Sequence, residues 1–248
     1  MNLNVRTEKP PVRRTLAWAV HLLTASGAVI GMISLIEILA GDFQSAALLM
    51  MLALAIDSID GTLARALDVK EWVPRVDGRR LDDIVDFLNF VVVPVVFMVA
   101  TGHLTSWVWA CIPVLASAYG FSQEESKTPD NFFRGWPSYW NVVAIYAWLL
   151  DLTVLAGTLW TLGLSIAIFV PIKYVYPSRV SILKRTTNGL GLAWGLLLTV
   201  CISTPEWSRS YSLPALSLLY PAYYIALSFW LGGLRDFIRS LGNPDTRQ

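Results

Sequence analysis

The sequence predicts an all-α polytopic membrane protein, and three observations support that prediction. Of the 248 residues, 55% are hydrophobic and only 15% are charged, whereas soluble domains average about 25% charged residues. The mean hydropathy is +0.53. The apolar residues fall in long runs without the alternation of barrel strands, which favours membrane-spanning helices. Together these observations exclude collagen-like, disordered and disulfide-scaffold classes.

We expect about eight membrane-spanning helices. Their expected limits are residues 15–40, 44–66, 81–101, 105–121, 138–152, 154–174, 190–203 and 213–234. The fifth and seventh segments are short for a helix that crosses a bilayer. No internal repeat or domain boundary is visible. Residues 1–248 are therefore expected to form a single integral membrane domain, with residues 1–14 as an N-terminal cytoplasmic segment.

The linkers between these segments alternate in charge. Those at 40–43, 102–104 and 151–152 carry no Lys or Arg. The linkers, termini and segment ends on the other side carry all but one of the 19 basic residues, and Arg209 is the exception. Because basic residues accumulate on the cytoplasmic side of membrane proteins, both termini are expected in the cytoplasm. An even number of spans agrees with that topology.

Gly27 and Gly31 lie one turn apart in the first segment, and Gly191 and Gly195 lie one turn apart in the seventh. Two small residues at this spacing let neighbouring membrane helices pack closely. We therefore expect a close helix contact along this face of each of the two helices.

Acidic residues gather at one end of two neighbouring predicted helices. Asp57 and Asp60 lie near the cytoplasmic end of the second segment, and Asp82, Asp83 and Asp86 lie at the cytoplasmic start of the third. Residues three or four apart share one face of a helix. Since the two segments run antiparallel, four of these carboxylates can converge.

Four converging carboxylates repel one another unless protons or cations compensate them. Carboxylate oxygens suit hard divalent ions such as Mg²⁺ or Mn²⁺, and acids within membrane segments mark functional sites by default. The sequence therefore predicts a divalent-metal site. The structural alternative is that these acids pair with nearby arginines, namely Arg65, Arg79 and Arg80.

Small residues accompany the acids. Gly61 directly follows the second acid, and Gly78 lies one turn before Asp82. A glycine inside a helix costs about 1 kcal/mol relative to alanine, and it is tolerated where a ligand approaches the backbone closely. Ala64 is also small, and Arg65 carries a guanidinium that matches phosphate. These residues indicate a nucleotide or phosphate beside the helix.

The pattern Asp57-x2-Asp60-Gly61-x2-Ala64-Arg65, followed by Gly78-x3-Asp82-x3-Asp86, resembles the signature of the CDP-alcohol phosphotransferases. All eight fixed positions are matched over 30 residues. The resemblance implies the fold of that family and a reaction in which an alcohol attacks the β-phosphate of a CDP-linked donor and CMP leaves. It also implies two divalent metal ions, Mn²⁺ or Mg²⁺.

The resemblance implies a role for each position of the signature. Asp86 would be the catalytic general base that takes the proton of the acceptor hydroxyl. The metal ligands would be Asp57, Asp60, Asp82 and Asp86. CDP would be bound by Asp57, Gly61, Ala64, Arg65, Gly78 and Asp82. Asp77 and Asp83 lie outside the signature and are expected to be supporting or loop charges.

Twelve residues separate Arg65 from Gly78, more than in most of the family. This spacing resembles the bacterial phosphatidylcholine synthase branch. Further stretches that resemble the branch are residues 21–27, 69–74, 132–137 with 140–141, and 171–173 with 177–179. The resemblance implies that CDP-diacylglycerol is the donor and choline the acceptor. Serine, inositol or glycerol 3-phosphate remain alternative acceptors. A further alternative is CDP-choline as the donor with diacylglycerol as the acceptor.

Choline recognition would use aromatic faces and nearby acids, because a quaternary ammonium offers no hydrogen-bond donor. The aromatic candidates at the cytoplasmic level are Trp136, Tyr139, Trp140, Tyr174 and Tyr176. The candidate acids are Glu124, Glu125 and Asp130. Four basic residues either anchor the chain to anionic lipid or bind phosphate, namely Arg134, Arg179, Lys184 and Arg185.

Two functions of other classes remain. In a cation transporter the carboxylates would be spread through the membrane depth, whereas here they cluster at one face. In a metal-dependent lipid hydrolase we would expect a His-rich metal set or a Ser–His pair. The family resemblance also implies a homodimer in the bacterial inner membrane, with its active site facing the cytoplasm and contacting membrane lipids. Nothing predicts a nucleic-acid partner.

Overall fold

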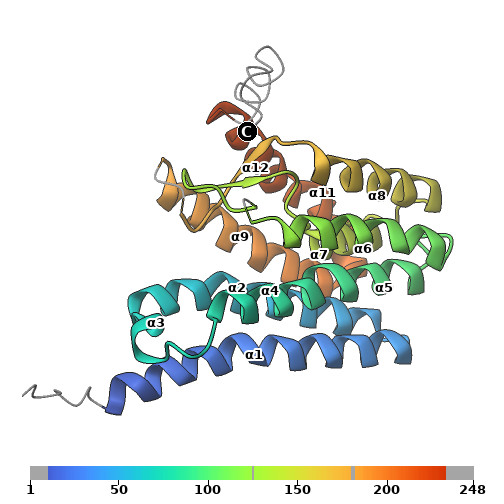
Figure 1. The fold of residues 1–248 in the computed structure, drawn as a ribbon. Coiled ribbons are helices and arrows are strands. Elements are labelled where there is room, and N and C mark those ends of the chain that lie inside the picture. The colour runs from blue at the N-terminus through green and yellow to red at the C-terminus, as the bar shows by residue number, and fades with distance from the viewer. Residues whose placement is uncertain (1–10, 125, 180–181, 233–248) are drawn as a thin grey trace, which may run out of the picture.

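The structure is a computed structural model, and it describes residues 11–124, 126–179 and 182–232. Within these residues the chain forms a helical bundle with one small two-stranded antiparallel sheet (Figure 1). The longer helices are α1 (Pro11–Ala40), α2 (Phe43–Ala66), α6 (Trp107–Ser122), α8 (Val154–Phe169), α9 (Lys184–Ser203) and α12 (Leu219–Trp230). The shorter helices are α3 (Val69–Trp72), α4 (Gly78–Phe87), η1 (Leu88–Val92), α5 (Val93–Ala100), α7 (Trp140–Leu149), α10 (Pro205–Ser210) and α11 (Leu213–Ser217).

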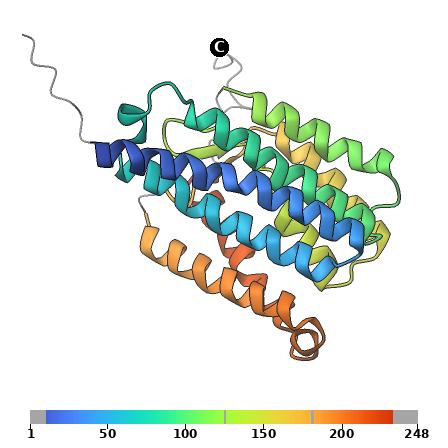
Figure 2. The same cartoon turned by 90° about the horizontal axis from the view of Figure 1, so that it is seen from below.

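Helices α1 and α2 form an antiparallel pair. The turn between them contains Gly41, whose φ of +81° suits a residue without a Cβ. Asp42 then caps α2, because its side chain accepts a 2.9 Å hydrogen bond from the backbone N–H of Ser45. The two helices lie against each other along their length (Figure 2). The pairing sets the middle of α1 beside the C-terminal half of α2.

The third predicted segment is a helix with an irregular centre, formed by α4, the π-helical turn η1 and α5. Asn89 in η1 donates from Nδ2 to the carbonyl oxygens of Gly27 (2.9 Å) and Val85 (3.0 Å), which ties this helix to α1. A Cβ on Gly27 would lie 2.6 Å from Cγ1 of Val85, and one on Gly31 would lie 2.8 Å from Oδ1 of Asn89. The predicted close packing is confirmed at both glycines. It is also confirmed at Gly191, where a Cβ would lie 2.7 Å from the hydroxyl oxygen of Tyr220, but it was wrong for Gly195, where a Cβ would meet nothing within 4 Å.

A short β-strand replaces the end of the sixth expected segment. Helix α8 ends at Phe169 rather than at residue 174, because Pro171 disfavours the helical conformation of the residue before it. The chain then enters β2 (Lys173–Val175), which pairs antiparallel with β1 (Phe132–Arg134). The prediction of helices alone was wrong here. The two-stranded sheet, α3 and the first turn of α9 lie at the same end of the molecule (Figure 1).

The last two segments also differ from expectation. Helix α9 begins at Lys184 rather than at residue 190, so it is 20 residues long and not short. The eighth segment is interrupted at Leu218, between α11 and α12. The break follows from Pro221, which has no N–H to bond the carbonyl of Ser217 one turn earlier.

Several helices can cross a membrane. Five described segments have the required length and hydropathy, namely Val12–Ala40, Phe43–Ala66, Gly78–Ala100, Lys184–Ser203 and Leu213–Trp230. Three shorter apolar helices, α6, α7 and α8, contain 16, 10 and 16 residues. These helices indicate a multi-pass membrane protein, as the composition predicts.

Candidate active site

Three aspartates from two helices form the centre of the candidate site. One carboxylate oxygen from each of Asp57, Asp82 and Asp86 lies within 4.8 Å of the other two. Asp57 belongs to α2, and the other two belong to α4. Helix α4 begins at Gly78 because Asp77 caps it, accepting a 3.2 Å hydrogen bond from the backbone N–H of Arg80. Asp82 and Asp86 lie one turn apart in α4, and their carboxylates approach that of Asp57 in α2.

Asp60 lies beside this triad and is held by α1. Its side chain is buried, and its Oδ2 accepts a 2.6 Å hydrogen bond from Oγ1 of Thr24. Asp57, Asp60 and Asp86 together line a narrow cavity of about 10 Å³. The structure therefore brings the four predicted metal ligands into one region, with three of them in a tighter group than the sequence predicts.

The donor set fits a hard divalent cation. The carboxylate oxygens of Asp57, Asp82 and Asp86 lie within 4.8 Å of one another, a separation at which ionised carboxylates need a proton or a cation to offset their repulsion. The ligand atoms of the triad are all carboxylate oxygens, which Mg²⁺ and Mn²⁺ prefer. The alternative of pairing with Arg79 and Arg80 does not describe the triad, because these arginines contact Asp83 and Asp77.

Lys127 approaches the carboxylates from the loop between α6 and β1. Its Nζ lies 3.6 Å from Oδ2 of Asp82 and 3.6 Å from Oδ1 of Asp83. Burial disfavours the ammonium, but Asp82 and Asp83 outweigh that effect and hold the pKa of Lys127 above its ordinary value. Lys127 thus stays charged at neutral pH. In the sequence Lys127 contributes only to the charge asymmetry of the linkers, and its position at the site is not predicted.

The other signature residues lie on the same two helices. Arg65 is exposed near the end of α2, and its Nη2 donates a 3.0 Å hydrogen bond to Oγ1 of Thr62. A Cβ on Gly61 would lie 3.3 Å from Nη1 of Arg65, while one on Gly78 would lie 3.1 Å from Cε1 of His21. Ala64 packs at the edge of a small cluster between α1 and α3. Gly61 meets only a flexible side chain, so packing within the protein does not explain it.

An aromatic cluster of Phe133, Tyr139, Tyr176 and Tyr224 lies next to the carboxylates. The ring centroid of Phe133 is 4.6 Å from that of Tyr176 and 6.4 Å from that of Tyr139. The ring of Tyr139 is 6.2 Å from that of Tyr224. Tyr139 interacts electrostatically with Asp57, and Tyr176 interacts with Lys127. Tyr139 and Tyr176 are among the aromatic candidates predicted from the sequence, whereas Phe133 and Tyr224 are not.

The remaining aromatic candidates have packing roles. Trp140 is fully buried and donates from Nε1 to Oγ of Ser117 at 2.8 Å. Trp136 packs edge-on against Trp140, with centroids 4.6 Å apart. Tyr174 is buried in β2 and contacts Phe229. The prediction that Trp136, Trp140 and Tyr174 face choline is not supported by these contacts.

The charged candidates have different surroundings. Asp130 forms a 2.8 Å ion pair with Lys173; slight burial favours its neutral form, but hydrogen bonds from Lys173 and Thr128 lower its pKa below the usual value. The guanidinium of Arg179 lies 5.3 Å from the ring centroid of Tyr176. Four further candidates have exposed side chains, namely Glu124, Arg134, Lys184 and Arg185. Glu125 lies outside the described residues.

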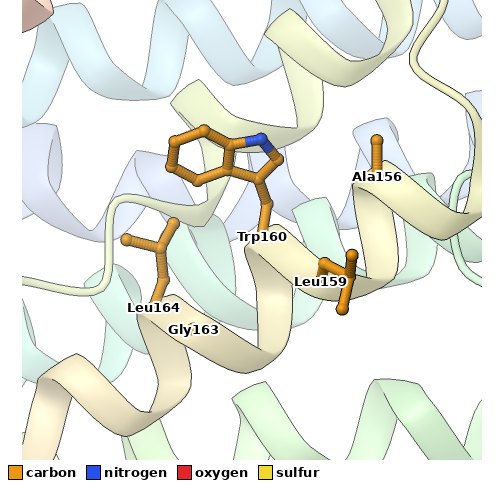
Figure 3. A pocket seen from close by; sticks show the side chains of 5 residues that line it. All are labelled: Ala156, Leu159, Trp160, Gly163 and Leu164. Carbon is orange, nitrogen blue, oxygen red and sulfur yellow. The ribbon is translucent and has the colours of Figure 1, made fainter.

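A larger hollow lies on α8. It has a volume of about 390 Å³ and is lined by Ala156, Leu159, Trp160, Gly163 and Leu164, which project from successive turns of one helix (Figure 3). Leu159 and Trp160 are about 60% exposed. No titratable side chain lines this hollow, so it offers no catalytic group. The carboxylate cluster is the candidate active site.

Comparison with known proteins identifies the family. The sequence model of the CDP-alcohol phosphatidyltransferases matches residues 18–172. The chain is 36% identical to the phosphatidylcholine synthase of Legionella pneumophila, over 86% of this chain and 88% of that protein. It is 36% identical to the phosphatidylcholine synthase of Borreliella burgdorferi, over 87% and 94%. For the phosphatidylcholine synthase of Pseudomonas aeruginosa the identity is 30%, over 91% and 96%. With its complete signature and its converging aspartates, the chain belongs to the CDP-alcohol phosphatidyltransferase family.

Proposed function

We propose that this protein is a phosphatidylcholine synthase, which transfers the phosphatidyl group of CDP-diacylglycerol to choline and releases CMP. The observation that carries the proposal is the convergence of Asp57, Asp82 and Asp86 from the two signature helices. Relatives named phosphatidylcholine synthase align over nearly the whole chain, which supports choline as the acceptor.

We propose that the carboxylates of Asp57, Asp60, Asp82 and Asp86 hold two divalent ions, Mn²⁺ or Mg²⁺. Such ions, when bound, neutralise the charge of the donor's pyrophosphate and of the departing CMP. Thr24 orients Asp60 through its 2.6 Å hydrogen bond. The oxygen-only donor set, in which Asp60 is buried and the other three aspartates are half-buried, supports this assignment.

The remaining signature residues bind and orient the donor. Gly61, Ala64 and Gly78 keep two helix faces free of bulky side chains, so the CDP moiety can approach the backbone. Arg65 presents an exposed guanidinium to phosphate. Asp86 acts as the general base and accepts the proton of the choline hydroxyl as its oxygen attacks the β-phosphate.

Choline binds in the aromatic cluster. Tyr139, Tyr176, Phe133 and Tyr224 offer ring faces beside the carboxylates, and a quaternary ammonium is attracted to such faces. The proximity of Tyr139 to Asp57 supports a cation subsite adjacent to the reacting groups. Arg134, Arg179, Lys184 and Arg185 contact the phosphate of the donor or of anionic membrane lipids.

In the cell, the protein crosses the bacterial inner membrane about eight times, with both termini and the active site on the cytoplasmic side. Residues 1–248 constitute one catalytic domain, and two copies form a homodimer. The five long apolar helices and the three shorter ones support the span number. Residues 1–10 and 233–248 lie outside the described residues, so the orientation rests on the positions of the basic residues.

A panel of acceptor alcohols tests the function. The purified protein is incubated with CDP-diacylglycerol, Mn²⁺ or Mg²⁺, and choline, serine, inositol or glycerol 3-phosphate in turn, and CMP release is measured. We expect release with choline alone and formation of phosphatidylcholine. Release with another alcohol but not with choline would refute the proposed acceptor and leave the family assignment intact. Release from CDP-choline and diacylglycerol would refute the proposed donor.

A further inference from the structure

Lys127 occupies a position at the carboxylate cluster that the family signature does not account for. It lies on the loop after α6, 41 residues beyond Asp86 in the chain. Its Nζ is nevertheless 3.6 Å from a carboxylate oxygen of both Asp82 and Asp83, and its side chain is only 27% exposed. A long-range contact of this kind places a permanent positive charge at the edge of the site.

Hydrogen bonds with the backbone of β1 fix the chain on both sides of Lys127. The backbone N–H of Arg134 donates to the carbonyl of Ser126 at 3.0 Å, and that of Thr128 donates to the carbonyl of Phe132 at 2.8 Å. Lys127 itself forms a β-bridge with Phe133. The lysine is therefore presented by an ordered segment, and the entropic cost of holding its ammonium in place is reduced.

The two partners of Lys127 differ in their relation to the site. Asp82 belongs to the triad, whereas Asp83 lies outside it and also pairs with Arg79, whose Nε is 3.9 Å from its Oδ2. The charge of Lys127 also acts on Asp57 and Asp86. Asp83 thus holds the ammonium from one side, while the other side faces the groups that are proposed to hold the metal ions.

We propose that Lys127 binds the pyrophosphate of the CDP-linked donor and that Asp83 positions its ammonium for that contact. The inference rests on the proposed function, because it assumes a CDP donor at the triad. A cation bound at the triad would compete with the ammonium of Lys127 for the carboxylate of Asp82. A lysine ammonium has three hydrogen-bond donors. When Asp82 serves a cation, Lys127 keeps Asp83 and has donors left for an anion, for which lysine acts as a point charge.

Two binding measurements on the full-length protein in detergent test the proposal. Mn²⁺ binding is measured without nucleotide, and CDP binding is measured in saturating Mn²⁺, for wild type, K127M, K127Q, K127R and D83N. In K127M and K127Q we expect Mn²⁺ to bind more tightly, since a competing cation is gone. CDP should bind about 10- to 100-fold more weakly, the range for a lost charge-assisted hydrogen bond. K127R should retain CDP binding, and D83N should weaken it.

K173M is the matched control. Lys173 lies on β2, the strand that pairs with β1. Its side chain is also 27% exposed, and it pairs with Asp130 rather than with the triad. Both affinities of K173M should equal those of wild type. If K127M and K127Q bind CDP as well as wild type does, the proposal is wrong. If Mn²⁺ and CDP binding both weaken and the unfolding midpoint falls, Lys127 would instead have a structural role in stabilising the two-stranded sheet, and the proposal would be wrong. Neither readout involves choline, so failure of the choline assay would refute the proposed function alone.

Discussion

Oγ1 of Thr24 donates a 2.6 Å hydrogen bond to Oδ2 of Asp60, which joins the first helix to the second at the candidate site. Thr24 lies outside the signature at residues 57–86. Its partner carboxylate is 4% exposed, so solvent does not replace the bond. Helix α1 therefore contributes to the candidate active site by fixing one of the proposed metal ligands.

Thr24→Val should lower choline-dependent CMP release, because valine has the shape of threonine but cannot donate to Asp60. A hydrogen bond to a charged group contributes about 1.5–3 kcal/mol, so we expect about a tenfold or larger loss of turnover or of Mn²⁺ affinity. Thr24→Ser keeps the hydroxyl and should retain most activity. Wild-type kinetics and Mn²⁺ affinity for Thr24→Val would show that the bond has no functional role.

Gly27→Ala should destabilise the protein, because the new Cβ would lie 2.6 Å from Cγ1 of Val85 and force α1 away from α4. Overpacking of this kind costs about 1–3 kcal/mol. Gly163 in α8 is the control, since a Cβ there meets nothing within 4 Å. Gly163→Ala should raise the thermal unfolding midpoint in detergent, because alanine favours the helix. A higher midpoint for Gly27→Ala would contradict the packing described for α1.

Tyr176→Leu should raise the KM for choline and leave the KM for CDP-diacylglycerol nearly unchanged. Leucine preserves most of the apolar volume but removes the aromatic face, which contributes about 0.5–2 kcal/mol to cation binding. Tyr174→Leu is the control, two residues earlier and in β2. It should leave the KM for choline unchanged, because Tyr174 packs against Phe229. Equal effects of the two variants on that KM would argue against the aromatic cluster as the choline subsite.

The topology can be tested with single cysteines. Cys111 and Cys201 are first replaced, and one cysteine is introduced at Tyr211 or at Lys184, both of which have exposed side chains. An impermeant thiol reagent applied from outside the inner membrane should label position 211. Position 184 should react only after permeabilisation. The opposite pattern would invert the orientation derived from the basic residues.

The sequence predicts the catalytic helices well because their information is local. Asp82 and Asp86 are one turn apart, and Asp57 lies on the preceding helix, so helix periodicity and chain proximity suffice to bring them together. The two-stranded sheet could not be predicted in this way. Its three-residue strands pair Phe132 with Val175, and so short a pairing across more than 40 residues leaves no periodic pattern.

Residue type alone also misassigned part of the site. Trp140 was a candidate for choline because it is aromatic and near the cytoplasmic level, but its indole is fully buried and bonded to Ser117. Lys127 is one of 19 basic residues in the sequence, and only the fold shows that its ammonium lies beside Asp82. Whether such a side chain faces a site or the core depends on tertiary contacts, which a single sequence does not contain.

Replacement of the triad aspartates is the most direct test of the central claim that Asp57, Asp82 and Asp86 form a metal-dependent active site. Choline-dependent CMP release is measured for D57N, D82N and D86N, with D68N as the control. Asp68 is exposed and has a φ of +48°, a conformation that asparagine also tolerates. We predict that D68N retains wild-type turnover, and that each triad variant loses about 10²-fold or more, at the scale of a lost general base or metal ligand, with an unchanged unfolding midpoint. Near-wild-type turnover in D57N, D82N or D86N would contradict the account.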